Sequence, residues 1–179
     1  YQQLYASQGP KKIIMETGAK RILGQPIGTV PGIFDPLIAE MNRQVKAGAI
    51  IDSPMVATVV PFQMIRLGSI ILVCGPGEFT TVSGQRVLNT VQQVLAANAD
   101  LEQVWLCSYS NDYMGYVTTF EEYQEQAYEG GHTLFGQWTL AACQTQFKHL
   151  AEQLLLPKPQ RSVDDRTRPA VIPVDELAK

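Results

Sequence analysis

The sequence has no apolar run near the ~20 residues that a membrane-spanning helix needs, so it predicts no transmembrane segment. Basic residues are scattered and the net charge is −3, whereas a nucleic-acid surface needs a basic stripe. We therefore expect no nucleic-acid partner. An apolar content of 45% with 17% charged residues is typical of a packed globular protein, and 179 residues suffice for one ordinary domain.

Cysteine and histidine are also rare. The three cysteines, Cys74, Cys107 and Cys143, are far apart and show no CxxC spacing. Cys74 and Cys107 lie in apolar, strand-like runs, which favours small core residues over metal ligands. The two histidines, His132 and His149, form no HExxH motif or other close pair. Neither residue type provides a self-contained metal motif.

Two common catalytic motifs are missing. The stretch GPGEFT follows an apolar run as a dinucleotide-binding loop does, but Thr80 stands where the third glycine of GxGxxG belongs. No GxSxG elbow surrounds Ser83, Ser108 or Ser110, so an α/β-hydrolase nucleophile has no support. Any chemistry must come from other residues.

The periodicity predicts an α/β fold with a mixed sheet, a βαβ unit and flanking helices. Expected strands occupy residues 56–66 and 69–73, joined as a hairpin by Leu-Gly, and 101–109; a helix over 81–97 connects the last two. Such a strand–helix–strand order favours a parallel pair with a right-handed crossover. We also expect a short strand within residues 11–16.

Helix signals flank this unit. Asp35 as N-cap and Pro36 at the first position predict a helix over about 36–47. Thr119 and Glu122 form a capping box that should begin a helix over 120–128, stopped by two glycines at 130 and 131. A last helix is expected over 134–155. Its predicted buried face is Leu134, Trp138, Ala141, Phe147, Leu150 and Leu154. The Pro-rich residues 157–179 are typical of a linker or tail.

Two features could carry function. Glu78 lies on a glycine-flanked turn at a strand end, where α/β proteins place working groups, although a solvated turn carboxylate is also possible. Five tyrosines follow the next strand within 20 positions: Tyr109, Tyr113, Tyr116, Tyr123 and Tyr128. They suit either packing or a substrate pocket. The ends of parallel strands share one sheet edge, so the acid and the tyrosines are expected to face one cleft.

At these residues the sequence resembles the neutral (non-lysosomal) ceramidase family. The matching stretches are VVPFQMIRLGSIILVCGPGEFTTVSGQRV and SNDYMGYVTTFEEYQEQAYEGGHTLFG. The first contains the family's P-G-E-x-T turn, and the second its long N-x-Y-x-x-Y-[IV]-T-T-x-E-E-Y-Q-x-Q-x-Y-E motif. Together they cover about 55 residues, which makes the resemblance specific.

The resemblance implies a zinc-dependent amidase that cleaves ceramide to sphingosine and a fatty acid. It implies that Glu78 and Tyr116 are zinc ligands, that Tyr116 and Tyr128 are catalytic, and that Tyr113 and Tyr128 contact the substrate. A carboxylate and a phenolate are oxygen ligands, and zinc at an open site activates amide hydrolysis. An N-acyl lipid is the implied substrate, and a secreted or periplasmic location is expected only from the family.

The chain also departs from the family. The other zinc ligands are histidines from an upstream segment, so this chain is expected to hold an incomplete site and to be inactive alone. Trp138 replaces a histidine in the family's Y-G-P-H-T-L stretch. We interpret residues 1–156 as the C-terminal portion of a catalytic domain, with an insertion at about 36–47. The tail fits the family's linker towards an immunoglobulin-like domain.

Two alternatives remain open. The first is a non-catalytic lobe or lipid-binding module without metal, with a groove lined by Tyr113, Tyr128 and Trp138. The second is a hydrolase of a different amide or ester.

Overall fold

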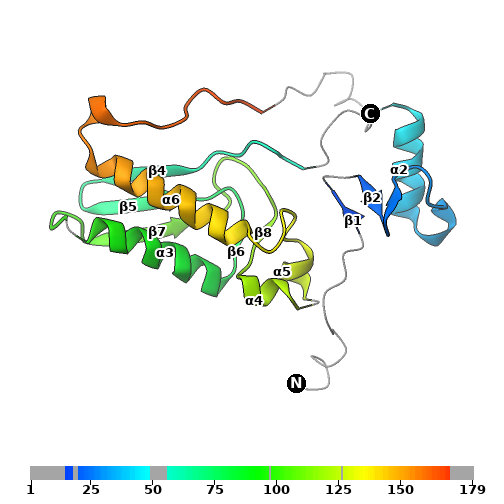
Figure 1. The fold of residues 1–179 in the computed structure, drawn as a ribbon, viewed down its shortest axis with the longest axis horizontal. Helices are drawn as coiled ribbons and strands as arrows, with labels where there is room; N and C mark the ends of the chain where they lie inside the picture. Colours follow the sequence, from blue (N-terminus) through cyan, green and yellow to red (C-terminus); the bar gives the residue numbers. More distant parts are fainter. Residues whose placement is uncertain (1–14, 18–19, 49–55, 97, 126, 170–179) are drawn as a thin grey trace, which may run out of the picture. The chain divides into compact units, whose positions relative to one another are not determined.

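The computed structural model describes residues 15–17, 20–48, 56–96, 98–125 and 127–169 (Figure 1). These residues fall into two compact units, one of residues 60–167 and the other formed mainly by the residues before 60. Within the described part, no helix is both long enough and apolar enough to cross a membrane. The mixed α/β class predicted from the sequence is confirmed, because the larger unit contains a mixed sheet with helices.

The smaller unit contains a three-stranded antiparallel sheet of β1 (Met15–Glu16), β2 (Arg21–Ile22) and β3 (Gln25–Pro26), followed by η1 (Gly32–Phe34) and α2 (Pro36–Lys46). The predicted helix over about 36–47 is confirmed. Asp35 caps it by accepting a hydrogen bond from the Leu37 backbone N–H at 2.7 Å. Within this helix Met41 is buried, whereas the Leu37 side chain is 62% exposed. Residues 11–14 of the expected first strand lie outside the described residues.

The larger unit is built on a sheet in the order β4-β5-β7, with β4 (Gln63–Leu67), β5 (Ile70–Cys74) and β7 (Gln103–Cys107). β4 and β5 form the predicted antiparallel hairpin, and β5 runs parallel to β7 through the crossover helix α3 (Thr81–Leu95). The predicted start of the first strand at 56 is wrong: β4 begins only after Pro61, which has no N–H for a ladder. The turn is Gly68-Ser69, with Gly68 at φ 63°.

Two helices, α3 and α6 (Thr139–Leu155), lie side by side and pack on one face of this sheet (Figure 1). Ile71 and Val73 of β5 face them, and both are fully buried. The helices contribute the rest of the buried core: Val87, Val91 and Leu95 from α3, and Leu140, Cys143, Phe147 and Ala151 from α6. Burial of this apolar surface fixes the strand ends that carry the candidate site.

The opposite face of the sheet carries apolar side chains that are exposed. Alternation along β5 places Leu72 away from the helices, beside its register partners Ile65 and Trp105. Ile65 is 42% exposed, Leu67 58% and Trp105 50%. We call this surface, formed by Ile65, Leu67, Leu72 and Trp105, the open face.

Beyond the main sheet, two short parallel strands pair with each other: β6 (Glu78–Phe79) and β8 (Tyr116–Val117). The capping box of Thr119 and Glu122 begins a helix as predicted, but α4 (Phe120–Tyr123) is only one turn long. A separate turn, α5 (Tyr128–Gly131), follows. The expected continuous helix over 120–128 is therefore wrong, and so is the expected glycine stop, because both glycines lie inside α5.

The last long helix also begins later than predicted, at Thr139 and not at residue 134. Gly136 has φ 89°, a conformation that interrupts a right-handed helix. The shift changes the buried face: Trp138 is 62% exposed and Ala141 is exposed, whereas Cys143 and Ala151 are buried with Phe147. After α6, η2 (Lys158–Gln160) leads into an extended segment that ends the described residues.

Candidate active site

Glu78 and Tyr116 are direct register partners in the parallel pair β6 and β8. β6 lies four residues after the end of β5, and β8 follows the loop that leaves β7. The fold therefore brings together the two features that the sequence analysis identified, namely the turn carboxylate and the tyrosine cluster. The parallel arrangement of β5 and β7 explains this, because both strands end at the same sheet edge.

The turn before Glu78 is held by backbone hydrogen bonds to residues 108–115, which we call the site loop. The Met114 N–H donates to the Pro76 carbonyl at 2.7 Å, and the Glu78 N–H donates to the Gly115 carbonyl at 3.0 Å. A Cβ on Gly77 would lie 2.7 Å from the Gly115 oxygen. Only glycine permits this close approach of the two backbones, so Gly77 fixes the distance between turn and loop.

Three tyrosine hydroxyls act on the Glu78 carboxylate. The Tyr113 Oη donates to Glu78 Oε1 at 2.7 Å. This bond, followed by bonds from Tyr116 and Tyr109, holds the pKa of Glu78 below its ordinary value. In return, hydrogen bonding to the carboxylate raises the pKa of Tyr113 to about 12 and also raises the pKa of Tyr116. Without a cation, the site therefore pairs an ionised acid with protonated phenols.

Tyr109 and Tyr113 also contact each other through their rings. Their centroids are 6.4 Å apart and the planes are nearly parallel, at 7°. Tyr109 has φ 57°, a conformation uncommon for a residue with a side chain, and its N–H donates to the Gly77 carbonyl at 3.2 Å. Sequence reasoning placed Tyr109 in the cluster but did not assign it to the site. Its position as the last residue of the strand predicted over 101–109 was the available signal, and the observed β7 ends before it, at Cys107.

Tyr128 lies next to Tyr116. The two rings meet edge to face, with centroids 5.7 Å apart and planes at 89°. The His132 ring is 4.2 Å from the Tyr128 ring, and its Nδ1 lies 2.8 Å from the Tyr128 carbonyl oxygen. Tyr128 is 66% exposed, so its hydroxyl can meet a molecule that approaches Tyr116.

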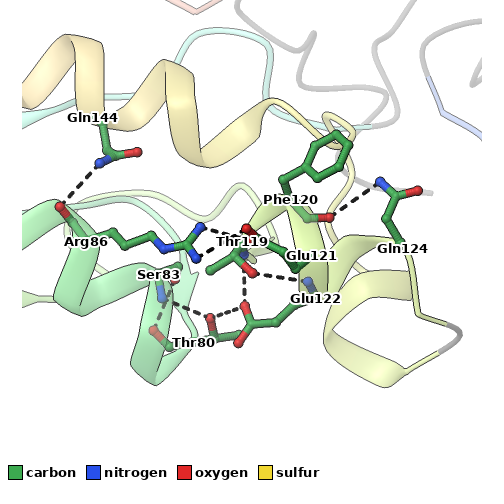
Figure 2. Close-up of polar contacts among 9 residues, drawn as sticks. All are labelled: Thr80, Ser83, Arg86, Thr119, Phe120, Glu121, Glu122, Gln124 and Gln144. Atoms are coloured by element: carbon green, nitrogen blue, oxygen red, sulfur yellow. Dashed lines mark hydrogen bonds and ion pairs between the residues drawn. The ribbon is translucent and has the colours of Figure 1, made fainter.

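A polar network fixes the helices next to this strand pair (Figure 2). Glu122 accepts one hydrogen bond from the Thr80 hydroxyl at 2.7 Å and one from the Thr119 N–H at 2.8 Å. Thr80 is the N-cap of α3 and Thr119 the N-cap of α4, so one carboxylate joins both helix starts. The Ser83 hydroxyl donates to the Val117 carbonyl at 2.6 Å. The sequence predicted the capping box but not this link between helices.

A cavity of about 500 Å³ opens beside Tyr116. Three of its lining residues are acidic, namely Glu122, Glu125 and Glu129, and the others are Phe79, Thr80, Thr81, Ala127 and Gly130. The cavity extends from Tyr116 towards α4 and α5. This lining includes neither Tyr113 nor Tyr128.

Comparison with known proteins identifies the family. The family model described as neutral/alkaline non-lysosomal ceramidase, N-terminal, matches residues 42–145, which is more than half of the chain. The chain belongs to this ceramidase family. The resemblance inferred from the sequence motifs is therefore confirmed, and the matched region contains Glu78 and all five tyrosines of the cluster.

Individual relatives agree with this assignment. Neutral ceramidase A of Dictyostelium discoideum is 43% identical over 111 residues, covering 62% of this chain and 16% of that protein. Neutral ceramidase of Pseudomonas aeruginosa is 37% identical over 150 residues, covering 82% of this chain and 22% of that protein. The crystal structure of the Pseudomonas aeruginosa enzyme matches with a TM-score of 0.63 and 38% identity over 68% of this chain and 19% of that chain. This chain thus spans less than a quarter of these ceramidases.

Other residues considered from the sequence lie apart from this strand pair. Trp138 packs against Phe120, with ring centroids 5.2 Å apart. His149 is on α6, where its Nε2 lies 3.0 Å from the Ser162 carbonyl oxygen. Among the described residues, no three His, Cys, Asp or Glu side chains gather closely enough to hold a metal ion. Of the site residues predicted from the sequence, Glu78 and Tyr116 are the two that the sheet topology pairs directly.

Proposed function

We propose that this chain supplies part of the active site of a zinc-dependent amidase that cleaves N-acyl sphingosine, or ceramide, to sphingosine and a fatty acid. The register pairing of Glu78 with Tyr116 carries the proposal, because it joins two oxygen donors at the end of adjacent strands. Membership of the ceramidase family and the names of the relatives support this substrate class. The remainder of the catalytic domain, upstream of this chain, is the partner that the proposal requires.

The residues present fit a zinc ion as two of its ligands. Glu78 and Tyr116 are register partners, and the Tyr116 hydroxyl is close enough to the Glu78 carboxylate to help lower its pKa, so the two oxygen donors lie near each other. The depressed pKa of Glu78 keeps its carboxylate ionised, as a ligand must be. Zinc takes about four ligands, and we assign the remaining positions to the upstream part of the polypeptide. When bound, zinc supplies Lewis-acid polarisation of the amide carbonyl.

The chain's own residues position the substrate around this pair. Tyr128 stands edge-on to Tyr116 with its hydroxyl exposed, where it can donate a hydrogen bond to the amide oxygen of the substrate. Tyr113 holds the Glu78 carboxylate through its hydroxyl, and its half-exposed ring offers apolar contact to the lipid. Tyr116 serves as a zinc ligand and also lines the cavity.

The first experiment uses the longest natural polypeptide that contains this chain. Zinc content and hydrolysis of a ceramide amide are measured for the unmodified protein, Glu78→Ala and Glu78→Gln. Glu152→Ala is the matched control, since Glu152 makes an exposed ion pair with Lys148 on α6. We expect zinc and hydrolysis to be lost together in both Glu78 variants, by more than the ~10–100-fold typical of an outer-shell change. The control should keep both properties.

Other outcomes separate the alternatives. A metal-free, inactive polypeptide that still binds N-acyl lipid would support a binding module, with Tyr113, Tyr128 and Trp138 as the residues to test. A zinc-containing protein that ignores ceramide but cleaves another amide or ester would retain the site and change the substrate.

A further inference from the structure

Two cysteines form a neighbouring pair at the end of the main sheet. Cys74 is the last residue of β5 and Cys107 the last residue of β7, and the two are register partners in the parallel ladder. Register partners point to the same face of a sheet, so both thiols lie on the face opposite α3 and α6. Both are free thiols, with Cys74 buried and Cys107 partly exposed.

The spacing of the two residues is suited to a disulfide. Adjacent strands lie ~4.7–4.9 Å apart, within the ~4.4–6.8 Å range of Cα separations in disulfides. The thiols already interact: burial raises the pKa of the Cys74 thiol most, and the Cys107 thiol raises it further. A bond between them requires only a modest approach of the two Cβ atoms.

The surroundings connect this pair to the candidate site. Gly75 follows Cys74, and its N–H donates to the Cys107 carbonyl at 3.0 Å. The Ser110 hydroxyl donates to the same carbonyl at 2.9 Å. The Asn111 side chain donates to Gln63, the β4 partner of Cys74, at 2.6 Å. The site loop therefore starts at the cysteine pair and passes over this end of the sheet.

We propose that Cys74 and Cys107 are a peroxide-sensitive dithiol that closes to an intrachain disulfide at the base of the site loop. This oxidation site is distinct from the amidase chemistry and does not depend on it. Cys107 is the more accessible thiol and meets the oxidant first. Cys74, held beside it by the sheet register, then completes the bond.

The chemistry balances with hydrogen peroxide as the oxidant. The Cys107 sulfur attacks one peroxide oxygen, so that an S–O bond forms, the O–O bond breaks and water leaves, giving a sulfenic acid. The Cys74 sulfur then attacks the Cys107 sulfur. The S–S bond forms, the S–O bond breaks, and the hydroxide leaves as water with the Cys74 proton. Two thiols are oxidised and one peroxide is reduced.

Closing the bond moves both strand ends. Disulfide Cβ atoms lie ~3.8 Å apart, closer than the strand spacing, so Cys74 and Cys107 must approach each other. The next residues along each strand are Gly75, in the turn before Glu78, and Ser108, in the site loop. A dithiol reductant opens a disulfide by thiol–disulfide exchange, so the bond should be reversible.

Mass spectrometry of the longest natural polypeptide that contains this chain tests the proposal. Reduced protein is treated with dilute hydrogen peroxide, blocked with N-ethylmaleimide while folded, and digested with trypsin and a glutamyl endopeptidase. Residues 67–78 and 103–121 then form separate peptides that contain Cys74 and Cys107. We expect loss of both free peptides and a linked product lighter than their sum by two hydrogen atoms, reversed by dithiothreitol.

Cys143 is the internal control, because its side chain is 1% exposed within the core and it should stay reduced. In Cys74→Ala, the linked product should disappear and Cys107 should advance to sulfinic acid; Cys143→Ala should behave as the unmodified protein. The proposal is overturned if Cys107 over-oxidises while Cys74 stays free in the unmodified protein. It is equally overturned if either cysteine links to a different partner. These readouts need neither zinc nor hydrolysis, so they are independent of the proposed amidase activity.

Discussion

The Thr80 hydroxyl donates a hydrogen bond of 2.7 Å to the Glu122 carboxylate, 42 residues away in the chain, and so links the N-cap of α3 to the capping box of α4. The N-cap of each helix follows one strand of the pair that carries the candidate site. Thr80 comes directly after β6, and Thr119 comes two residues after β8. The bond therefore links the two chain segments that carry Glu78 and Tyr116.

Replacing Glu122 by Gln should weaken this link. The substitution removes the negative charge that accepts two hydrogen bonds. Since a hydrogen bond to a charged group contributes about 1.5–3 kcal/mol at most, we expect the free energy of unfolding to fall by about 1–3 kcal/mol. Glu121→Gln is the matched control, since its pair with Arg86 is exposed and should contribute less. Urea denaturation of both variants measures the difference, and equal losses would contradict the linking role.

A double-mutant cycle of Thr80→Val with Glu122→Gln isolates the bond itself. We expect a coupling free energy of about 1 kcal/mol, because the two side chains share one hydrogen bond. Strictly additive effects would mean that the two residues act only as separate caps.

Replacing Tyr113 by Phe should raise the pKa of Glu78, because its hydroxyl is the largest contributor to the depressed value. In the folded protein the pKa of Glu78 lies below its ordinary value of 4.5. The hydrogen bonds to the ionised carboxylate therefore stabilise the fold fully above pH 4.5, and this stabilisation is lost as the pH falls through the lowered pKa. The variant should be less stable at neutral pH and show a shallower decline in acid. A ¹³C NMR titration of Glu78 measures the pKa. Tyr128→Phe is the control, and it should leave the pKa of Glu78 unchanged.

Replacing Gly115 by Ala should distort the pairing of Glu78 with Tyr116. Gly115 has φ 86°, and a Cβ there would lie 2.7 Å from the His132 carbonyl oxygen. We expect a loss of more than about 1 kcal/mol in unfolding free energy, since the residue is strained and crowded. Gly131→Ala is the control, because a Cβ at Gly131 meets nothing within 4 Å. Similar stability of the two variants would show that the loop adapts.

Replacing Phe147 by Ala should destabilise the larger unit by about 3–5 kcal/mol, because the ring is fully buried in the core. It packs edge-on against Phe62 at 5.2 Å and lies 6.5 Å from Phe79 of β6, so the cavity forms below the site. Phe135→Ala, at a position that is 45% exposed, is the control. Urea denaturation again compares them; a small effect at Phe147 would indicate that the core repacks.

The sequence predicted those features that depend on local patterns. The crossover of β5, α3 and β7 follows from apolar periodicity, and the caps at Asp35 and Thr119 follow from short-range chemistry. Local patterns failed where the backbone departs from them. The expected helix over 120–128 splits into two turns, and Gly136 delays α6, so that Trp138 faces outward and not into the core.

The convergence of Glu78 with the tyrosine cluster was predictable from strand direction alone. The individual hydrogen bonds were not, since Tyr109 and Tyr113 reach Glu78 only through a loop with positive φ at Tyr109 and Asn111. The link from Thr80 to Glu122 depends on how α3 and α4 meet, which no spacing within one helix specifies. The zinc, the roles of Tyr116 and Tyr128 and the boundary at residue 156 remain predictions.

The open face has a practical consequence for handling this polypeptide. Ile65, Leu67, Leu72 and Trp105 form an apolar surface, and in the part of the chain that the structure describes α3 and α6 pack against the other face of the sheet. In water, such a surface promotes self-association. Among the described residues, β4 and β7 are the outer strands of the sheet, and their free edges can pair with strands of other chains. Produced alone, the chain should therefore self-associate as its concentration rises, and replacing Trp105 by a charged residue should reduce this tendency.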